Sequence, residues 1–179
     1  MRLFWRNGFD GTSINDLAEA MNINPPSLYS AFGDKRSLFA EAVQAYLAGP
    51  GQCAAQALEA TTAREAVEQL LAGAVQTFTQ PSCPTGCMVV LAATCCSPES
   101  LDIAATLATQ RRYFEQAIHV RLRRGQDNGE VPSDVNVESL AAYVVIVYQG
   151  LALAARDGSS REDLQQVLKH VMQAWPGAA

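Results

Sequence analysis

The sequence predicts an all-α protein, in which an N-terminal three-helix helix-turn-helix domain precedes a larger helical domain. Three observations predict this class. Apolar residues recur at the i, i+3, i+4, i+7 spacing of a helix face through most of the chain. Ser or Thr stands before several of these stretches, with an acidic residue three positions later, as at many helix starts. The composition, 49% hydrophobic and 17% charged residues, suits a globular helical protein and argues against disorder.

Length and charge narrow the class further. A chain of 179 residues can bury a proper core in one or two domains. Its formal net charge of −5 provides no general basic field for nucleic acid, although DNA binding needs only one local face.

The sequence also favours a cytoplasmic protein. Met1 to Trp5 is too short for a signal peptide, and the apolar run from Leu140 to Ala155 is shorter than the ~20 residues of a membrane span. Five cysteines, an odd number without an export signal, suit a reducing compartment. We therefore expect no membrane partner.

The first helix is expected to be truncated. Leu3, Phe4 and Trp5 resemble the end of an amphipathic helix that stops at Asn7-Gly8. A helix this short is marginal alone, so residues ahead of Met1 are expected. A misassigned start codon and a naturally shortened protein are both compatible with this pattern.

The stretch from Ser13 to Phe32 predicts two short helices joined by a tight turn. Ser13 with Asp16 forms a capping pattern before the first helix, and Asn24 with Pro25-Pro26 marks the start of the second. Leu28 and Phe32 supply an inner face for the second helix, which leaves its first turn exposed. Two short crossed helices of this kind are a helix-turn-helix.

A fourth helix is expected to close the N-terminal domain. Gly33-Asp34 is a break followed by a cap, and an apolar stripe then runs from Leu38 to Tyr46. Gly49-Pro50-Gly51 ends it. We place the domain boundary here, with residues 1–48 as the first domain and residues 49–179 as the second.

The second domain is expected to be a succession of helices. A capping box at Thr62 starts a helix that is striped to Phe78, and Cys87 to Cys96 is predicted to be a short buried helix. A long helix should run from Pro98 to Asn128, and two more should occupy 140–155 and the stretch after Ser160. The expected inner residues of the long helix are Leu101, Leu107, Tyr113, Phe114, Ile118 and Leu122.

Residues Leu3 to Phe39 resemble the DNA-binding domain of the TetR/AcrR family of transcriptional regulators. The matching features are Gly8-Phe9, Thr12-Ser13-Ile14, Leu17-Ala18, Leu28-Tyr29, Phe32, Asp34-Lys35 and Leu38-Phe39, in order and without gaps. The remaining chain has the length of that family's ligand-binding and dimerisation domain, and its resemblance is architectural.

The resemblance implies a DNA-contacting face on the paired helices. Tyr29 and Lys35 would hold phosphates with help from Thr12 and Ser13, and Asn24, Pro25, Pro26, Ser27 and Ser30 would approach the bases. Hydroxyls, a helix N-terminus and one lysine suit phosphate oxygens, and small polar groups suit base edges. The alternative is that Tyr29 is a packing residue and Asn24 only a cap.

The charge of this domain departs from the family pattern. Residues 1–48 carry four basic and five acidic side chains, a net charge of −1. No Arg lies in the second paired helix to bind guanine. Because counterion release scales with the phosphates neutralised, we expect weak DNA binding with a shallow salt dependence.

Apolar stripes on the last two helices predict a homodimer, since the family dimerises through these helices and a palindromic operator requires a twofold dimer. Gly150 would allow two backbones to approach closely, and some of the stripe must be intrachain core. The candidate interface residues are Tyr143, Val144, Val147, Leu151, Leu164, Val167, Leu168, Val171 and Met172.

By the same resemblance a ligand pocket is expected among the middle helices. Its candidate lining is Phe78, Met88, Leu91, Thr94, Gln110, Tyr113, Phe114, Tyr148 and Gln149, each of which could equally be core. This make-up favours a small apolar or aromatic molecule. The family mechanism implies that binding tilts the helix from Asp34 to Ala48.

Four of the five cysteines lie close together in the sequence. Cys83, Cys87, Cys95 and Cys96 crowd a loop and the predicted buried helix, where Cys83 and Cys87 could form a redox pair or half of a metal site. The only histidines, His119 and His170, are distant in sequence, and buried cysteine is most often a small hydrophobe. We expect no catalytic residues, no metal and no cofactor, and therefore no enzyme.

The sequence thus predicts a ligand-responsive regulator, most simply a repressor that binds a palindromic operator as a homodimer and is released by a small apolar or aromatic ligand. Two alternatives remain. One is a small-molecule-binding protein of the same fold with weak or lost DNA binding, and the other is a thiol-based redox sensor.

Overall fold

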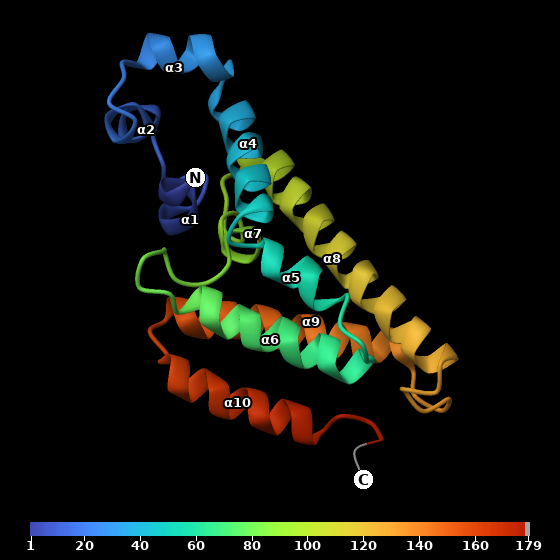
Figure 1. Ribbon diagram of the computed structural model, residues 1–179. Helices are drawn as coiled ribbons and strands as arrows, with labels where there is room; N and C mark the ends of the chain where they lie inside the picture. The colour runs from blue at the N-terminus through green and yellow to red at the C-terminus, as the bar shows by residue number, and fades with distance from the viewer. Residues whose placement is uncertain (178–179) are drawn as a thin grey trace.

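The N-terminal domain consists of four helices in the computed structural model, which describes residues 1–177. They are α1 (Arg2–Asn7), α2 (Ile14–Ala20), α3 (Pro25–Phe32) and α4 (Lys35–Ala48). Figure 1 shows α2 and α3 at one end of the molecule, with α4 leading from them toward the rest of the chain. No strand occurs within residues 1–177, which confirms the predicted all-α class.

Local caps form the paired helices as predicted. Ser13 and Asp16 make a complete capping box, in which Ser13 Oγ accepts from Asp16 N at 3.1 Å and Asp16 Oδ2 accepts from Ser13 N at 2.8 Å. Asn24 Oδ1 accepts from Ser27 N at 2.9 Å at the start of α3. Each cap satisfies a backbone donor that the first helical turn leaves without a partner.

Aromatic packing holds α1 in place despite its length of six residues. Phe4 and Trp5 are both fully buried. The Phe4 ring meets the ring of Phe39 on α4 edge to face at 5.0 Å between centroids, and Phe9 meets Phe39 at 5.2 Å. Tertiary contacts therefore stabilise a helix that would not persist alone.

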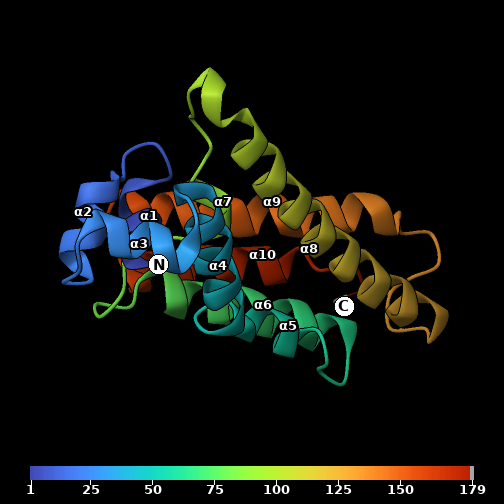
Figure 2. The ribbon, with the colours of Figure 1, turned by 90° about the horizontal axis from the view of Figure 1, so that it is seen from above.

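The C-terminal domain contains α5 (Gln52–Ala57), α6 (Ala63–Phe78), α7 (Met88–Leu91), the 3₁₀ turn η1 (Pro98–Ser100), α8 (Leu101–Asp127), α9 (Val137–Arg156) and α10 (Arg161–Gln173). Helices α6 and α9 pack side by side with α10 beneath them, and the long α8 crosses α9 (Figure 1). Figure 2 shows α4 above the region where α7, α8 and α9 meet. The N-terminal domain therefore packs against the second domain where α7, α8 and α9 meet.

Three features of this domain differ from the sequence prediction. The predicted helix from Cys87 to Cys96 is only the single turn of α7, because the carbonyl of Ala92 accepts a hydrogen bond from Phe9 N at 2.8 Å instead of continuing the helix. Leu101 and Tyr113 were expected inside and are 62% and 66% exposed. Helix α5 was not predicted.

Helix α9 is the one described helix that is long and apolar enough by composition to cross a membrane. It packs against α6 and α8, and eight of its residues are buried in the core of the domain. One face of α9 remains exposed.

Candidate nucleic-acid interface and effector cavity

The first turn and outer side of α3 are exposed at the far end of the N-terminal domain (Figure 1). Tyr29 is 49% exposed, and Ser27 and Ser30 lie on the same helix with exposed side chains. Pro26 is exposed and Pro25 is half-buried. Lys35, at the start of α4, is half-buried.

Three of the predicted DNA-contacting side chains have roles within the protein. Thr12 is completely buried, and its hydroxyl donates to the carbonyl of Gly8 at 2.7 Å. It therefore faces the domain interior rather than a phosphate, which corrects the expectation from the sequence. Ser13 and Asn24 are exposed, but their side-chain oxygens cap α2 and α3.

Lys35 lies beside an aromatic ring. Its ammonium group stands 4.3 Å from the centroid of Phe9, and partial burial lowers the pKa of Lys35. The aromatic ring stabilises the cation and orients it. The adjacent Arg36 is turned toward the second domain, where its Nε lies 3.0 Å from Asp102 Oδ2.

Besides the hydrogen bond from Phe9 N to the Ala92 carbonyl, two sets of side-chain contacts join the domains. The first, which we call the inner seam, is made by Trp5, Tyr46 and Arg156 with residues 85–87. Trp5 Nε1 donates to the carbonyl of Gly86 at 3.0 Å, and the Tyr46 hydroxyl lies 3.3 Å from Cys87 Sγ. Arg156 donates to the carbonyls of Trp5 and Arg6, each at 2.7 Å, at the C-terminal end of α1.

The second set, the outer seam, joins Asp10 and Arg36 to residues 97–102. Asp10 accepts hydrogen bonds from Ser97 N at 2.6 Å and from the Ser100 hydroxyl. Arg36 pairs with Asp102 and donates to the carbonyl of Glu99. This seam fastens η1 and the start of α8 to the helix-turn-helix.

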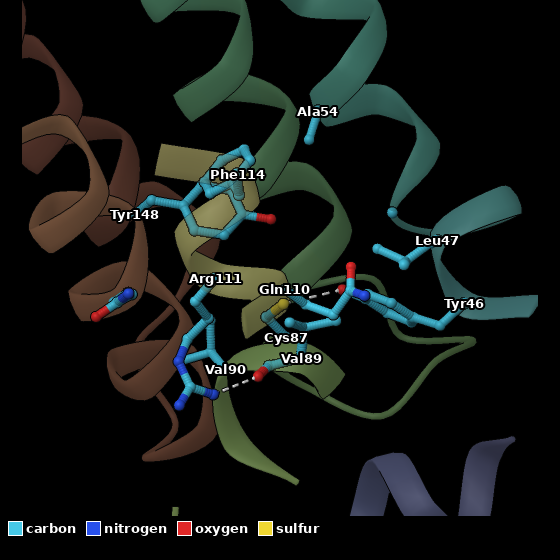
Figure 3. A pocket seen from close by; sticks show the side chains of 12 residues that line it. Tyr46, Leu47, Ala54, Cys87, Val89, Val90, Gln110, Arg111, Phe114 and Tyr148 are labelled. Carbon is cyan, nitrogen blue, oxygen red and sulfur yellow. Dashed lines mark hydrogen bonds between the residues drawn. The ribbon is translucent and has the colours of Figure 1, made fainter. Parts of the chain in front are cut away.

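A cavity of about 70 Å³ adjoins the inner seam at Tyr46 and Cys87 (Figure 3). Helices α4 and α5 with the turn between them contribute one wall, α7 contributes a second, and α8 and α9 contribute the third. The lining residues are Tyr46, Leu47, Gly51, Ala54, Cys87, Val89, Val90, Gln110, Arg111, Phe114, Tyr148 and Gln149. It is therefore formed by residues of both domains.

Four residues of the predicted pocket line this cavity, namely Gln110, Phe114, Tyr148 and Gln149. The other five, Phe78, Met88, Leu91, Thr94 and Tyr113, do not. Phe78 packs behind Tyr148 at 5.2 Å between ring centroids, and Met88 is fully buried elsewhere in the core. Thr94 is exposed, since α7 ends before it.

Sequence reasoning missed the wall that α4 and α5 contribute. Tyr46 and Leu47 were assigned to the N-terminal domain, and α5 was not predicted at all. The small residues Gly51 and Ala54 were the only indication in the sequence that space would remain there.

One of the polar groups that line the cavity, the Arg111 guanidinium, is charged. It donates to the carbonyl of Val89 at 2.9 Å (Figure 3). Burial raises the pKa of the Tyr46 and Tyr148 hydroxyls, and burial also raises the pKa of the Cys87 thiol. The cavity thus presents phenols, a thiol, amides and one guanidinium on an otherwise apolar surface, which suits a small, mostly apolar molecule with a polar group.

The cysteines do not gather into a site. All five are free thiols, Cys87 buried and Cys95 exposed. No group of three or more His, Cys, Asp or Glu side chains with metal-binding geometry occurs in residues 1–177.

The predicted dimer face divides into two parts. Val144, Leu151, Leu164 and Met172 are buried within the chain, because α9 and α10 pack them against α6 and one another, so for these four the expectation is corrected. Tyr143, Val147, Val167, Leu168 and Val171 remain at least partly exposed. Ile146 and Leu153, at 67% and 53% exposure, extend the stripe on α9 and were missed.

Comparisons with known proteins match both domains. Residues 1–42 match the family described as bacterial regulatory proteins, tetR family, and residues 63–171 match the tetracyclin repressor-like C-terminal domain. The HTH-type transcriptional repressor ComR of Escherichia coli is 33% identical over 178 residues, covering 98% of this chain and 85% of ComR.

Solved structures show the same similarity. A cysteine mutant of the TetR family transcriptional regulator CifR, complexed with 26-base-pair operator DNA, is 40% identical with a TM-score of 0.94, over 98% of this chain and 92% of that one. A TetR-type regulator from a Rhodococcus species is 37% identical with a TM-score of 0.68, over 98% and 94% of the two chains.

Proposed function

The chain belongs to the TetR family of bacterial transcriptional regulators, and from that premise we propose that it is a repressor that binds a palindromic operator as a homodimer and is released by a small apolar or aromatic ligand. In this proposal residues 1–48 bind DNA, and residues 49–179 bind the ligand and the second subunit. The proposal has three parts, which are a DNA contact, a subunit contact and a ligand site.

The DNA contact would be made by α3 and the start of α4. Tyr29 and Lys35 would hold phosphates with Ser13, and Asn24, Pro25, Pro26, Ser27 and Ser30 would lie at the base edges. Support comes from the exposure of Ser27, Tyr29 and Ser30 on α3 and from the orientation of Lys35 by Phe9. Thr12 would act from inside the domain by holding the turn before α2.

The subunit contact would use the exposed stripe on α9 and α10. Tyr143, Ile146 and Leu153 are large apolar residues that the chain leaves exposed. A Cβ atom added at Gly150 would meet nothing within 4 Å, so α9 leaves room there for a partner helix. A twofold contact through this face would place two α3 helices on one duplex.

One observation carries the ligand part of the proposal. The cavity is lined by Tyr46 and Leu47, the last turn of the helix that begins at Lys35. A molecule in the cavity would therefore touch α4 directly, and a shift of α4 would move α3.

The first experiment measures binding to the intergenic DNA upstream of the protein's own gene, titrated against salt. We expect an inverted-repeat footprint, and Tyr29→Ala and Lys35→Ala should each weaken binding more than tenfold. Lys35→Ala should also lower the salt slope by about one, because one phosphate contact is lost.

Arg112→Ala and Lys169→Ala are the controls, since both side chains are exposed and lie on α8 and α10, away from α3. All four variants should keep the dimer mass and helical content. Wild-type-like DNA binding by Tyr29→Ala and Lys35→Ala would refute the proposed face, and absence of any salt-sensitive binding would refute the repressor itself.

A further inference from the structure

A second hollow adjoins the cavity on the outside of the second domain. It is a groove of about 680 Å³ between α5 and α8, which we call the α5–α8 groove. Ala54, Ala55 and Leu58 line it from α5, and Tyr113, Ala117 and Val120 line it from α8. Tyr113 and Val120 are 66% and 58% exposed, so this apolar surface is uncovered in the protein.

The groove and the cavity are neighbours with a shared wall. Leu47, Gly51, Ala54 and Phe114 line both spaces. Phe114 is the largest of the four and is half-buried, with its ring 4.8 Å from that of Tyr148 in the cavity. A rotation of the Phe114 side chain would join the two spaces without moving a helix.

The two spaces differ in chemistry. The cavity is small and carries the Tyr46 and Tyr148 hydroxyls and the Gln110 amide among apolar groups. The groove is larger and mostly apolar, and its charged lining residues are Glu59, Arg121 and Arg124. Glu59 and Arg124 are exposed, and Arg121 is already paired with Glu130 at 3.3 Å.

We propose that the cavity and the α5–α8 groove are two compartments of one effector site, which takes an amphipathic molecule with a compact hydrogen-bonding head and an apolar tail. This inference rests on the proposed function and specifies its ligand. The head occupies the cavity, the tail passes Phe114, and the tail lies along α8 in the groove.

The head must form hydrogen bonds, because polar groups line the cavity that holds it. These groups are the Tyr46 and Tyr148 hydroxyls, the Gln110 amide and the Arg111 guanidinium, which donates to the Val89 carbonyl at 2.9 Å. Hydroxyl, amide and guanidinium donors match a hydroxyl or carbonyl oxygen on the ligand.

The tail is apolar because most of the groove surface is apolar. Alanine stands at Ala54, Ala55 and Ala117, so the space exists where larger side chains would have closed it. A tail here also contacts Leu47 at the end of α4, and its length therefore affects the helix that carries the DNA-binding surface.

The test uses straight-chain primary alcohols of increasing length as probes, with calorimetric binding to the dimer and release of fluorescent operator DNA as readouts. Each buried methylene should tighten binding about fourfold. We expect this increase to continue well past the few carbons that the cavity alone could hold.

Val120→Glu places a charge on the groove wall and should flatten the increase for long alcohols by at least tenfold, while short alcohols bind as in the wild type. Ala105→Glu is the control, because Ala105 is also exposed on α8 but lies outside the groove.

The outcomes separate this inference from the proposed function. Short alcohols that bind and release the operator, with no gain from longer chains or no effect of Val120→Glu, would overturn the groove and leave the ligand-responsive repressor intact. Binding of no alcohol at any length would overturn both the two-compartment site and the apolar ligand. A changed mass of the assembly in Val120→Glu would assign the groove to a protein contact instead.

Discussion

The inner and outer seams join the same two domains with different chemistry. The inner seam is buried: Trp5 and Tyr46 are 0% and 1% exposed, and their rings meet at 4.8 Å between centroids. The outer seam is built on the surface, where the side chains of the Arg36–Asp102 pair are 49% and 58% exposed. Burial therefore distinguishes two contacts that each span the same domain boundary.

This difference predicts that the two seams have different roles. Buried aromatic packing and desolvated hydrogen bonds stabilise one arrangement strongly, whereas exposed charges contribute little and are screened by salt. The cavity adjoins the inner seam, where a ligand would meet the contact that holds the domains together. The outer seam would instead restrict the orientation of the helix-turn-helix domain, without determining whether that domain packs against the second domain.

The largest expected effect follows removal of the Trp5 side chain. Trp5→Ala should lower the free energy of unfolding by about 3–5 kcal/mol, because it leaves a cavity in the inner seam and an unpaired Gly86 carbonyl. Denaturant unfolding followed by circular dichroism measures this loss.

Trp5→Phe keeps most of the packing and removes only the indole donor to Gly86, so its loss should be about 1 kcal/mol. A loss equal to that of Trp5→Ala would place the strength of the seam in the hydrogen bond, and a negligible loss in Trp5→Ala would contradict the inner seam as the dominant contact.

The second effect tests the arginine in the inner seam. Arg156→Met should cost about 1–2 kcal/mol, since the carbonyls of Trp5, Arg6 and Thr85 each lose a donor but can be partly hydrated. The freed carbonyls end α1, so hydrogen exchange in residues 2–7 should accelerate.

Arg161→Met is the matched control for that substitution. Arg161 donates to Thr79 Oγ1 and to the carbonyl of Gln76, both inside the second domain. A comparable loss of stability without faster exchange in α1 is expected. Equal acceleration of exchange in α1 by both variants would argue that Arg156 acts through general stability rather than on the seam.

The sequence predicts contacts that are local better than those of either seam. The caps at Ser13, Asn24 and Asp34 each join residues three apart, and α2, α3 and α4 follow from them. The end of α7 depends instead on a bond between Phe9 and Ala92, which no local pattern contains. The predicted helix from Cys87 to Cys96 was too long for this reason.

The candidate sites show the same limit. The exposed surface of α3 follows from its own apolar face, but the cavity needs Tyr46 beside Cys87, residues far apart in the chain. On α10, Leu164 is buried and Val167 is exposed, although both belong to one apolar stripe. Helical periodicity identifies an apolar stripe without saying which part of it another helix of the same chain covers.

The third prediction concerns pH at the outer seam. Hydrogen bonds from the Ser100 hydroxyl and from Ser97 hold the pKa of Asp10 below its usual 3.8. A carboxyl group with a lowered folded-state pKa stabilises the protein above pH 3.8, and this contribution is lost as the pH falls through the lowered pKa.

Asp10→Asn should therefore unfold at lower denaturant than the wild type near neutral pH, and the difference should narrow once the pH drops below 3.8. Comparing the two proteins at each pH removes the contribution of the other carboxyl groups. A difference that stays constant to low pH would mean that the amide disrupts the seam sterically and that the charge of Asp10 is not involved.

The smallest effect is expected for the Arg36–Asp102 ion pair. The hydrogen bond between the two side chains lowers the pKa of Asp102 and raises that of Arg36, but both groups remain in contact with solvent. A double-mutant cycle of Arg36→Gln and Asp102→Asn should give a small coupling at low ionic strength that disappears at high salt, because exposed charges are screened. The same cycle on Trp5→Phe and Arg156→Met should be insensitive to salt, since those groups bond to buried or half-buried carbonyls. A salt-independent coupling for Arg36 and Asp102 would show that the two seams do not differ in kind, and the helix-turn-helix would then be held as firmly at its outer edge as at Trp5.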